Sequence, residues 1–168
     1  MTEVWKAIAE EFVDLPSAAA LTRVAVRLVL AALLGGVLGF EREKRGKQAG
    51  MRTHMMIAVG AAMFALVPQQ AGMSEDAVAR VLQGLVAGIG FLGAGPILKL
   101  EERKEVRGLT TAASIWLTAA MGMAVGLGRG ATAVVATALA LLILAVLPKP
   151  EDHTGKEKEQ PPPQRVQV

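Results

Sequence analysis

Residues 24–40 read VAVRLVLAALLGGVLGF and residues 41–53 read EREKRGKQAGMRT, and this change from an apolar to a basic stretch decides the fold. A helix needs about 20 mostly apolar residues to cross the hydrocarbon of a bilayer. The first stretch contains a single charge, Arg27. The second stretch is too highly charged to enter the hydrocarbon. We therefore expect a membrane-spanning helix that ends in a basic surface loop.

The same alternation recurs along the chain, in which 52% of the 168 residues are hydrophobic. The spans that it predicts are residues 24–40, 54–67, 78–98, 110–127 and 131–147. The second span is short, so we expect it to include Pro68 and Gln69. The chain has no cysteine, which excludes disulfides and thiolate chemistry. The sequence thus predicts an all-α polytopic membrane bundle of about five transmembrane helices.

Basic residues gather in alternate connectors between these spans. Residues 41–53 contain five and residues 99–107 contain four, whereas residues 68–77 contain none. Because basic loops stay in the cytoplasm, the N-terminus is expected outside and the C-terminus inside, which requires an odd number of spans. The net charge of +3 then reflects these loops, and we expect no nucleic-acid partner.

Three regions follow from this pattern. Residues 1–22 form an external N-terminal segment whose apolar residues, such as Trp5 and Ile8, recur at helical spacing. This segment is either an amphipathic helix on the membrane surface or an ordinary lead-in helix. Residues 23–147 form the transmembrane domain. Residues 148–168 are rich in proline and charge, and we expect a disordered cytoplasmic tail.

Glycines at four-residue spacing predict which helices pack closely, because small residues let helix backbones approach within lipid. The pairs are Gly35 and Gly39, Gly84 and Gly88, and Gly122 and Gly126, with Gly90 and Gly93 close by. The first, third and fourth spans are therefore expected to be tightly packed, and the fifth to face lipid. The same faces could support a homodimer. Residues 88–93 also match GxGxxG, but they lie inside an apolar span, so we expect no dinucleotide and no other cofactor.

Two segments of the chain are alike at a constant spacing. Gly50-Met51-Arg52-Thr53 resembles Gly108-Leu109-Thr110-Thr111, 58 residues later, and similar isoleucine and alanine positions follow each. Each segment begins the helix that leaves a basic loop. A tandem two-helix repeat would explain the likeness, and so would chance similarity between alanine-rich helices.

Several charged residues near the helix ends are candidates for function. Arg27 lies just inside the first span, where it either serves a function or extends its charge to the interface. Glu41 and Glu43 flank Arg42, and pairing with basic neighbours is favoured over cation binding. Two acids are also too few for a hard cation, which takes about six oxygen ligands, so we expect no metal site.

The starts of the second and fourth spans carry the remaining candidates. Thr53 is a suitable helix cap. His54 could titrate between about pH 5 and 8, or be an incidental interfacial residue. If the two hairpins pack side by side, Arg52 and Arg107 together with the helix N-termini make a patch that attracts anions.

Hydroxyls line the fourth span, and their default role is hydrogen bonding within the bundle. They belong to Thr110, Thr111, Ser114 and Thr118. Trp116 lies inside the same span and needs a hydrogen-bond partner, for which Gln83 is a candidate. We find no catalytic constellation and do not expect an enzyme.

Ordered motifs give the chain a family resemblance. They are Arg27, LLGG at 33–36, GFERE at 39–43, GMRTH at 50–54, GIGFLGAG at 88–95 and RGLTTAASIW at 107–116. With these motifs the chain resembles the MgtC/SapB family of bacterial inner-membrane proteins over residues 23–147. The resemblance implies a five-span protein linked to magnesium limitation, acid stress and virulence.

The resemblance also implies partners. Some members restrain the ATP synthase rather than carry magnesium. The best-studied members have a folded cytoplasmic C-terminal domain, in whose place this chain has the 148–168 tail. Two functions stay open: a regulator that binds another membrane complex, and a small magnesium-linked transporter or channel. The few polar residues at mid-membrane favour the regulator.

Overall fold

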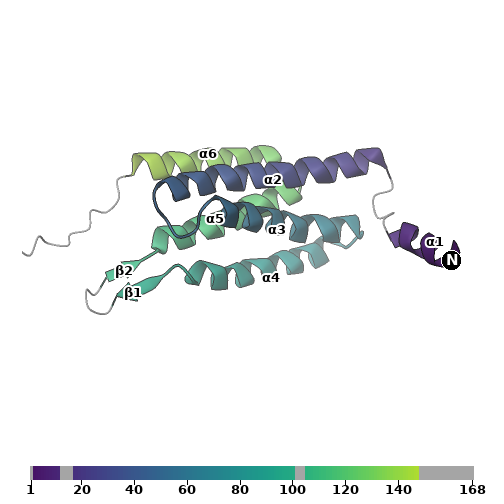
Figure 1. The fold of residues 1–168 in the computed structure, drawn as a ribbon, viewed down its shortest axis with the longest axis horizontal. Helices are drawn as coiled ribbons and strands as arrows, with labels where there is room; N and C mark the ends of the chain where they lie inside the picture. Colours follow the sequence, from purple (N-terminus) through teal and green to yellow (C-terminus); the bar gives the residue numbers. More distant parts are fainter. Residues whose placement is uncertain (1, 12–16, 101–104, 148–168) are drawn as a thin grey trace, which may run out of the picture.

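The computed structural model describes residues 2–11, 17–100 and 105–147 (Figure 1). The elements in order are α1 (Thr2–Glu11), α2 (Ala18–Lys44), α3 (Met51–Gln70), α4 (Glu75–Ala94), β1 (Leu98–Leu100), β2 (Glu105–Arg107), α5 (Leu109–Gly126) and α6 (Gly130–Val146). The tail expected at residues 148–168 lies outside the described residues.

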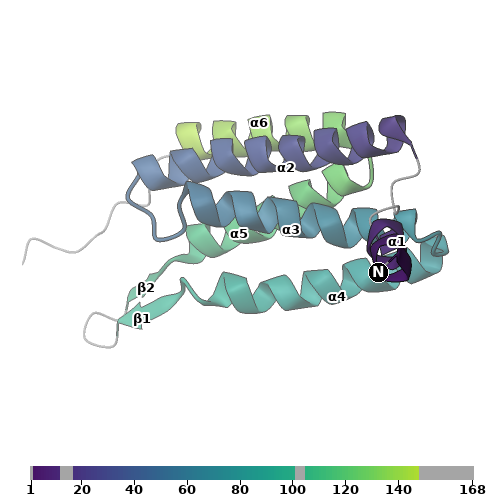
Figure 2. The ribbon, with the colours of Figure 1, turned by 45° about the vertical axis from the view of Figure 1, so that its right-hand side comes forward.

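Helices α2 to α6 run side by side in one bundle, which confirms the all-α polytopic fold (Figures 1 and 2). By length and composition, α2, α3, α4 and α5 could each cross a membrane. Helix α6 has 17 residues and no charge. That length is at the lower limit of about 17 residues for a span. As expected, α3 continues through Pro68 and ends at Gln70.

The helix starts follow from local sequence. The hydroxyl of Ser17 accepts a hydrogen bond from the Ala20 N–H at 3.1 Å. The hydroxyl of Ser74 accepts one from the Ala77 N–H at 3.3 Å. Each serine therefore satisfies a backbone donor that the first turn of α2 or α4 leaves free.

Helices α3 and α5 are the two inner helices of the bundle: α3 packs against α2, α5 and α4, and α5 packs against all four others. A Cβ atom added to Gly39 of α2 would lie 2.6 Å from the Met51 Cα, and one added to Gly35 would lie 2.6 Å from the His54 carbonyl oxygen. On the other side, Cβ atoms on Gly122 and Gly126 of α5 would collide with α3 carbonyl oxygens. These four glycines therefore allow backbone-to-backbone contact on both sides of α3.

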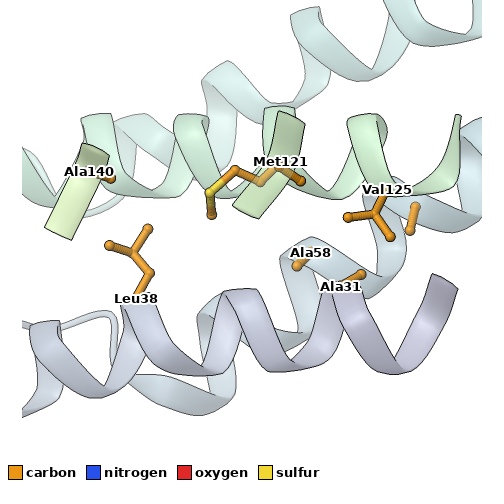
Figure 3. Packing of buried hydrophobic residues seen from close by; sticks show 8 residues of the cluster. Ala31, Leu38, Ala58, Met121, Val125 and Ala140 are labelled. Atoms are coloured by element: carbon orange, nitrogen blue, oxygen red, sulfur yellow. The ribbon is translucent and has the colours of Figure 1, made fainter. Parts of the chain in front are cut away.

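Larger side chains fill the space between α2, α5 and α6. Leu38 of α2 and Met121 and Val125 of α5 are almost fully buried, and they belong to one apolar cluster with Ala58 and Ala140 (Figure 3).

The expectation that the third span packs tightly was wrong for contacts within one chain. Cβ atoms added to Gly84, Gly88 or Gly90 of α4 would meet nothing within 4 Å. One on Gly93 would make an ordinary contact of 3.7 Å with the Ala112 carbonyl oxygen. Only 17% of the apolar window of α4 is buried, against 50% for α5.

The second span is an inner helix instead, beside the fourth. Its small residues are alanines rather than glycines, and they face α2 and α5; the buried ones are Ala58, Ala61, Ala62 and Ala65. Glycine pairs alone therefore do not indicate that this helix is tightly packed.

A short β-hairpin replaces the end of the expected third span. Helix α4 ends at Ala94, before Gly95 and Pro96, and a proline has no N–H with which to continue a helix. Strands β1 and β2 then pair antiparallel, with Leu98 opposite Arg107. The sequence predicted only a basic loop here.

Candidate functional site

The turn between α2 and α3 is held by a carboxylate. Glu43 accepts a hydrogen bond from the Met51 N–H at 2.8 Å. Gly50 is the N-cap of α3 and has no side chain to offer. Glu43 therefore takes the capping role expected of Thr53, which is exposed within the first turn. The positive end of the α3 helix dipole also stabilises a carboxylate at this position.

His54 lies in the bundle core rather than at the membrane interface, and its side chain is 0% exposed. Its Nδ1 lies 2.9 Å from the Gly50 carbonyl oxygen, and its Nε2 lies 3.2 Å from the Ser114 Oγ. The second contact joins α3 to α5. The close approach of α2 at Gly35 and Gly39 closes the remaining side of this histidine.

The hydroxyls of α5 bond inside the bundle, as the sequence predicted by default. Ser114 donates to the Thr111 carbonyl oxygen at 2.8 Å, and Thr118 donates to the Ser114 carbonyl oxygen at 2.7 Å. All three side chains are buried. Ser114 is therefore the connection between the α5 backbone and His54.

A buried ion pair closes the end of α2. Arg42 is 2% exposed, and its Nη1 lies 3.7 Å from the Glu41 Oε2. Glu41 also pairs with the Arg45 Nε. Among the described residues, the Nε and Nη2 atoms of Arg42 have no hydrogen-bond partner. A buried guanidinium with free N–H groups is costly unless a further acceptor completes it.

Helices α3 and α5 begin at the same end of the bundle and lie side by side (Figures 1 and 2). The side chains of Arg52, Thr53 and Thr110 are exposed there. Strand β2 places Arg107 immediately before α5, and its side chain lies outside what the structure describes. This end thus brings together Glu41, Arg42, His54, Thr111 and Ser114.

Two candidates lie elsewhere. Trp116 is 50% exposed on the surface of α5, and Gln83 is exposed on α4. Among the hydrogen bonds of the described residues, none joins them, so the expected pair was wrong. Because the indole faces outward, it needs no partner inside the bundle.

Arg27 lies toward the opposite end, where its Nη1 donates to the Gly126 carbonyl oxygen at 2.8 Å. A cation at the C-terminus of α5 also suits the helix dipole. Gln69 of α3 donates to the same carbonyl oxygen at 3.3 Å. From the sequence, Gln69 was expected only to extend the second span. Its position, a polar residue just after an apolar block and at the same end as Arg27, is the feature that indicates this contact.

An apolar bundle whose polar side chains gather toward its two ends defines a polytopic membrane protein. The chain belongs to the MgtC family, whose family model matches residues 28–153. This confirms the expected family, and with it a multi-pass protein of the bacterial inner membrane.

Curated relatives support this assignment. Protein SrpB of Synechococcus elongatus is 49% identical over 59% of this chain and 60% of its own length. The putative magnesium transporter YhiD of Escherichia coli K12 is 45% identical over 60% of this chain and 49% of its own. Protein MgtC of Brucella abortus is 47% identical over 61% of this chain and 42% of its own. The chain thus spans about half the length of these relatives. No solved structure matches it.

Proposed function

We propose that this protein is a non-enzymatic membrane regulator of ion homeostasis that acts by binding another membrane complex. The observation that carries the proposal is the close packing around α3, where glycines of α2 and α5 touch its backbone on both sides. Such contact leaves no room for an ion between these helices. Among the described residues, no three acidic or histidine side chains gather as metal ligands would.

The end that carries Arg42 is the proposed docking surface. Exposed Arg52 and the N-terminus of α3 favour a negatively charged partner, whereas Arg42 is buried and lies beneath this surface. Arg107 precedes the neighbouring helix and would add to this charge. The internal ion pair with Glu41 is the structural alternative for Arg42.

Growth under magnesium limitation tests this surface. Arg52→Ala and Arg107→Ala should each reduce growth at normal membrane abundance, whereas Arg80→Ala, on exposed α4 residue Arg80 at the opposite end, should not. Normal growth of both variants would contradict the docking surface.

A magnesium-linked transporter is the second candidate, favoured by the printed name of the Escherichia coli relative. Two measurements separate the candidates. A regulator should co-purify from native membranes with a stoichiometric partner, for which the resemblance suggests the ATP synthase. A transporter should instead carry Mg²⁺ into proteoliposomes that contain the purified chain alone, and such uptake would overturn the regulator.

A further inference from the structure

Helix α2 carries two arginines, Arg23 and Arg27, one turn apart, and a groove runs on either side of them. The larger groove, of about 580 Å³, lies between α2 and the junction of α5 and α6. The smaller groove, of about 280 Å³, lies between α2 and α3. Both arginines line both grooves. We call this feature the arginine ridge.

The two grooves differ in chemistry. Val26, Leu30 and Val125 give the larger one an apolar wall. Its volume falls in the range of roughly 300–1,000 Å³ that small-molecule sites occupy. The smaller groove is lined at its α3 side by Gln69 and Gln70, which offer amide groups. An occupant that suits both must combine an apolar chain with a polar head.

The charge of the arginine ridge is not neutralised by the described residues. Within them, the ion pairs are those of Glu41 with Arg42 and Arg45, at the other end of the bundle. Arg27 uses its Nη1 on the Gly126 carbonyl oxygen, which carries no full charge. A guanidinium has five N–H donors, so further donors are free for an anion. Two arginines at the edge of a membrane would therefore bind a negatively charged group.

The depth of the arginine ridge matches lipid phosphates. Helix α2 has 27 residues. At about 1.5 Å per residue it is roughly 40 Å long, and the hydrocarbon core is only about 30 Å thick. Since the charged residues from Glu41 to Lys44 leave the hydrocarbon at one end of α2, the rest of the excess brings the first turns, with Arg23, close to the headgroups at the other.

We propose that the arginine ridge binds an anionic phospholipid, with the phosphate on Arg23 and one acyl chain in the larger groove. The fork of the guanidinium matches a phosphate in a bidentate manner. Gln70 is exposed beside the ridge and would contact the rest of the headgroup. This site lies opposite the proposed docking surface and does not depend on it.

Lipid titration of the purified chain, followed by native mass spectrometry, tests the site. Dioleoylphosphatidylglycerol should bind about tenfold more tightly than dioleoylphosphatidylcholine. Both lipids carry a phosphate, but the quaternary ammonium of choline offsets its charge and is repelled by the two arginines. Arg23→Gln should abolish that preference. Val26→Trp should weaken both lipids by filling the apolar groove, and Val26 is exposed, so the fold should persist.

Arg80→Gln is the matched control, because Arg80 is an exposed arginine at the same end but lines neither groove. It should leave the lipid preference unchanged. Equal loss in Arg80→Gln, or an unchanged preference in Arg23→Gln, would overturn the site. Competition by glycerol 3-phosphate as strong as by the whole lipid would show an anion site without an acyl chain, which also overturns the proposal.

Discussion

The hydrogen bonds around His54 depend on how many protons its imidazole carries. Its Nδ1 faces a carbonyl oxygen, its Nε2 faces the Ser114 Oγ, and that hydroxyl donates to the Thr111 carbonyl oxygen. These three hydrogen bonds require three protons, but a neutral imidazole and one hydroxyl supply two. With neutral His54, Ser114 can donate either to Nε2 or to Thr111, and only an imidazolium satisfies all three contacts. With a neutral imidazole, the link between α3 and α5 therefore competes with the hydrogen bond from Ser114 to Thr111 within α5.

Ser114→Ala should destabilise the protein by about 1–3 kcal/mol, because it leaves the buried Nε2 of His54 without a partner. Thermal unfolding in detergent measures the effect. Thr110→Ala removes an exposed hydroxyl from the same helix and should change little. Equal stability of the two variants would mean that the contact between His54 and Ser114 contributes nothing.

The burial of His54 could not be predicted from the sequence. It lies one turn inside α3, next to exposed Arg52 and Thr53, and local sequence favours an interfacial position. Burial follows from the contact of α2 with α3 at Gly35 and Gly39, which is a property of two helices. The residue type alone marked His54 as a candidate. Its role became clear only from the residues that surround it in the bundle.

At the level of helices, the position of a glycine matters more than its spacing. The pairs in α2 and α5 touch α3, whereas the equally spaced pair in α4 faces away from the other helices. Most helix boundaries, in contrast, were predictable to within about four residues, since they follow from hydropathy and from caps such as Ser74. Helix α2 begins six residues before the expected span, at Ala18. Which side of a helix meets its neighbour depends on the whole bundle.

Gly122→Leu and Gly88→Leu are a matched pair that separates these positions. A side chain at 122 would collide with the Ala58 carbonyl oxygen, so we expect a loss of about 1–3 kcal/mol or more. At 88 nothing lies within 4 Å, so folding should be nearly unchanged. Thermal unfolding in detergent measures both, and equal losses would contradict the packing described.

The link from the hairpin to α5 also requires a glycine. Gly108 has φ +92°, and a Cβ there would collide with the Pro96 carbonyl oxygen. Gly46 has φ +64° with nothing within 4 Å of its Cβ position. Gly46→Ala should therefore cost only the left-handed backbone strain, about 1–2 kcal/mol, and Gly108→Ala clearly more. If unfolding curves place both variants at the same stability, the contact with Pro96 is not restrictive.

Across the whole molecule, the two ends of the bundle carry different chemistry. One end holds the ion pairs, His54 and the starts of α3 and α5; the other holds the arginine ridge. The alternation of basic loops predicted which turns share an end, because charge is distributed along the chain in the same order as the turns. The grooves beside α2 were not predictable, since residues from α2, α3, α5 and the turn after it form them.

Reporter fusions test how these ends face the membrane. The turn at Gly46 and the turn at Gly72 lie at opposite ends of the bundle (Figure 1). The first turn is rich in basic residues and the second, between α3 and α4, has none, so Gly46 should be cytoplasmic and Gly72 external. A phosphatase reporter, active only outside the cytoplasm, should therefore be active after Gly72 and inactive after Gly46. The opposite result would invert the bundle and place the arginine ridge in the inner leaflet.

A second set of variants tests whether the basic residues cause this orientation. Neutralising Lys44, Arg45 and Lys47 together should weaken the preference for a cytoplasmic first turn, since these charges keep that turn inside.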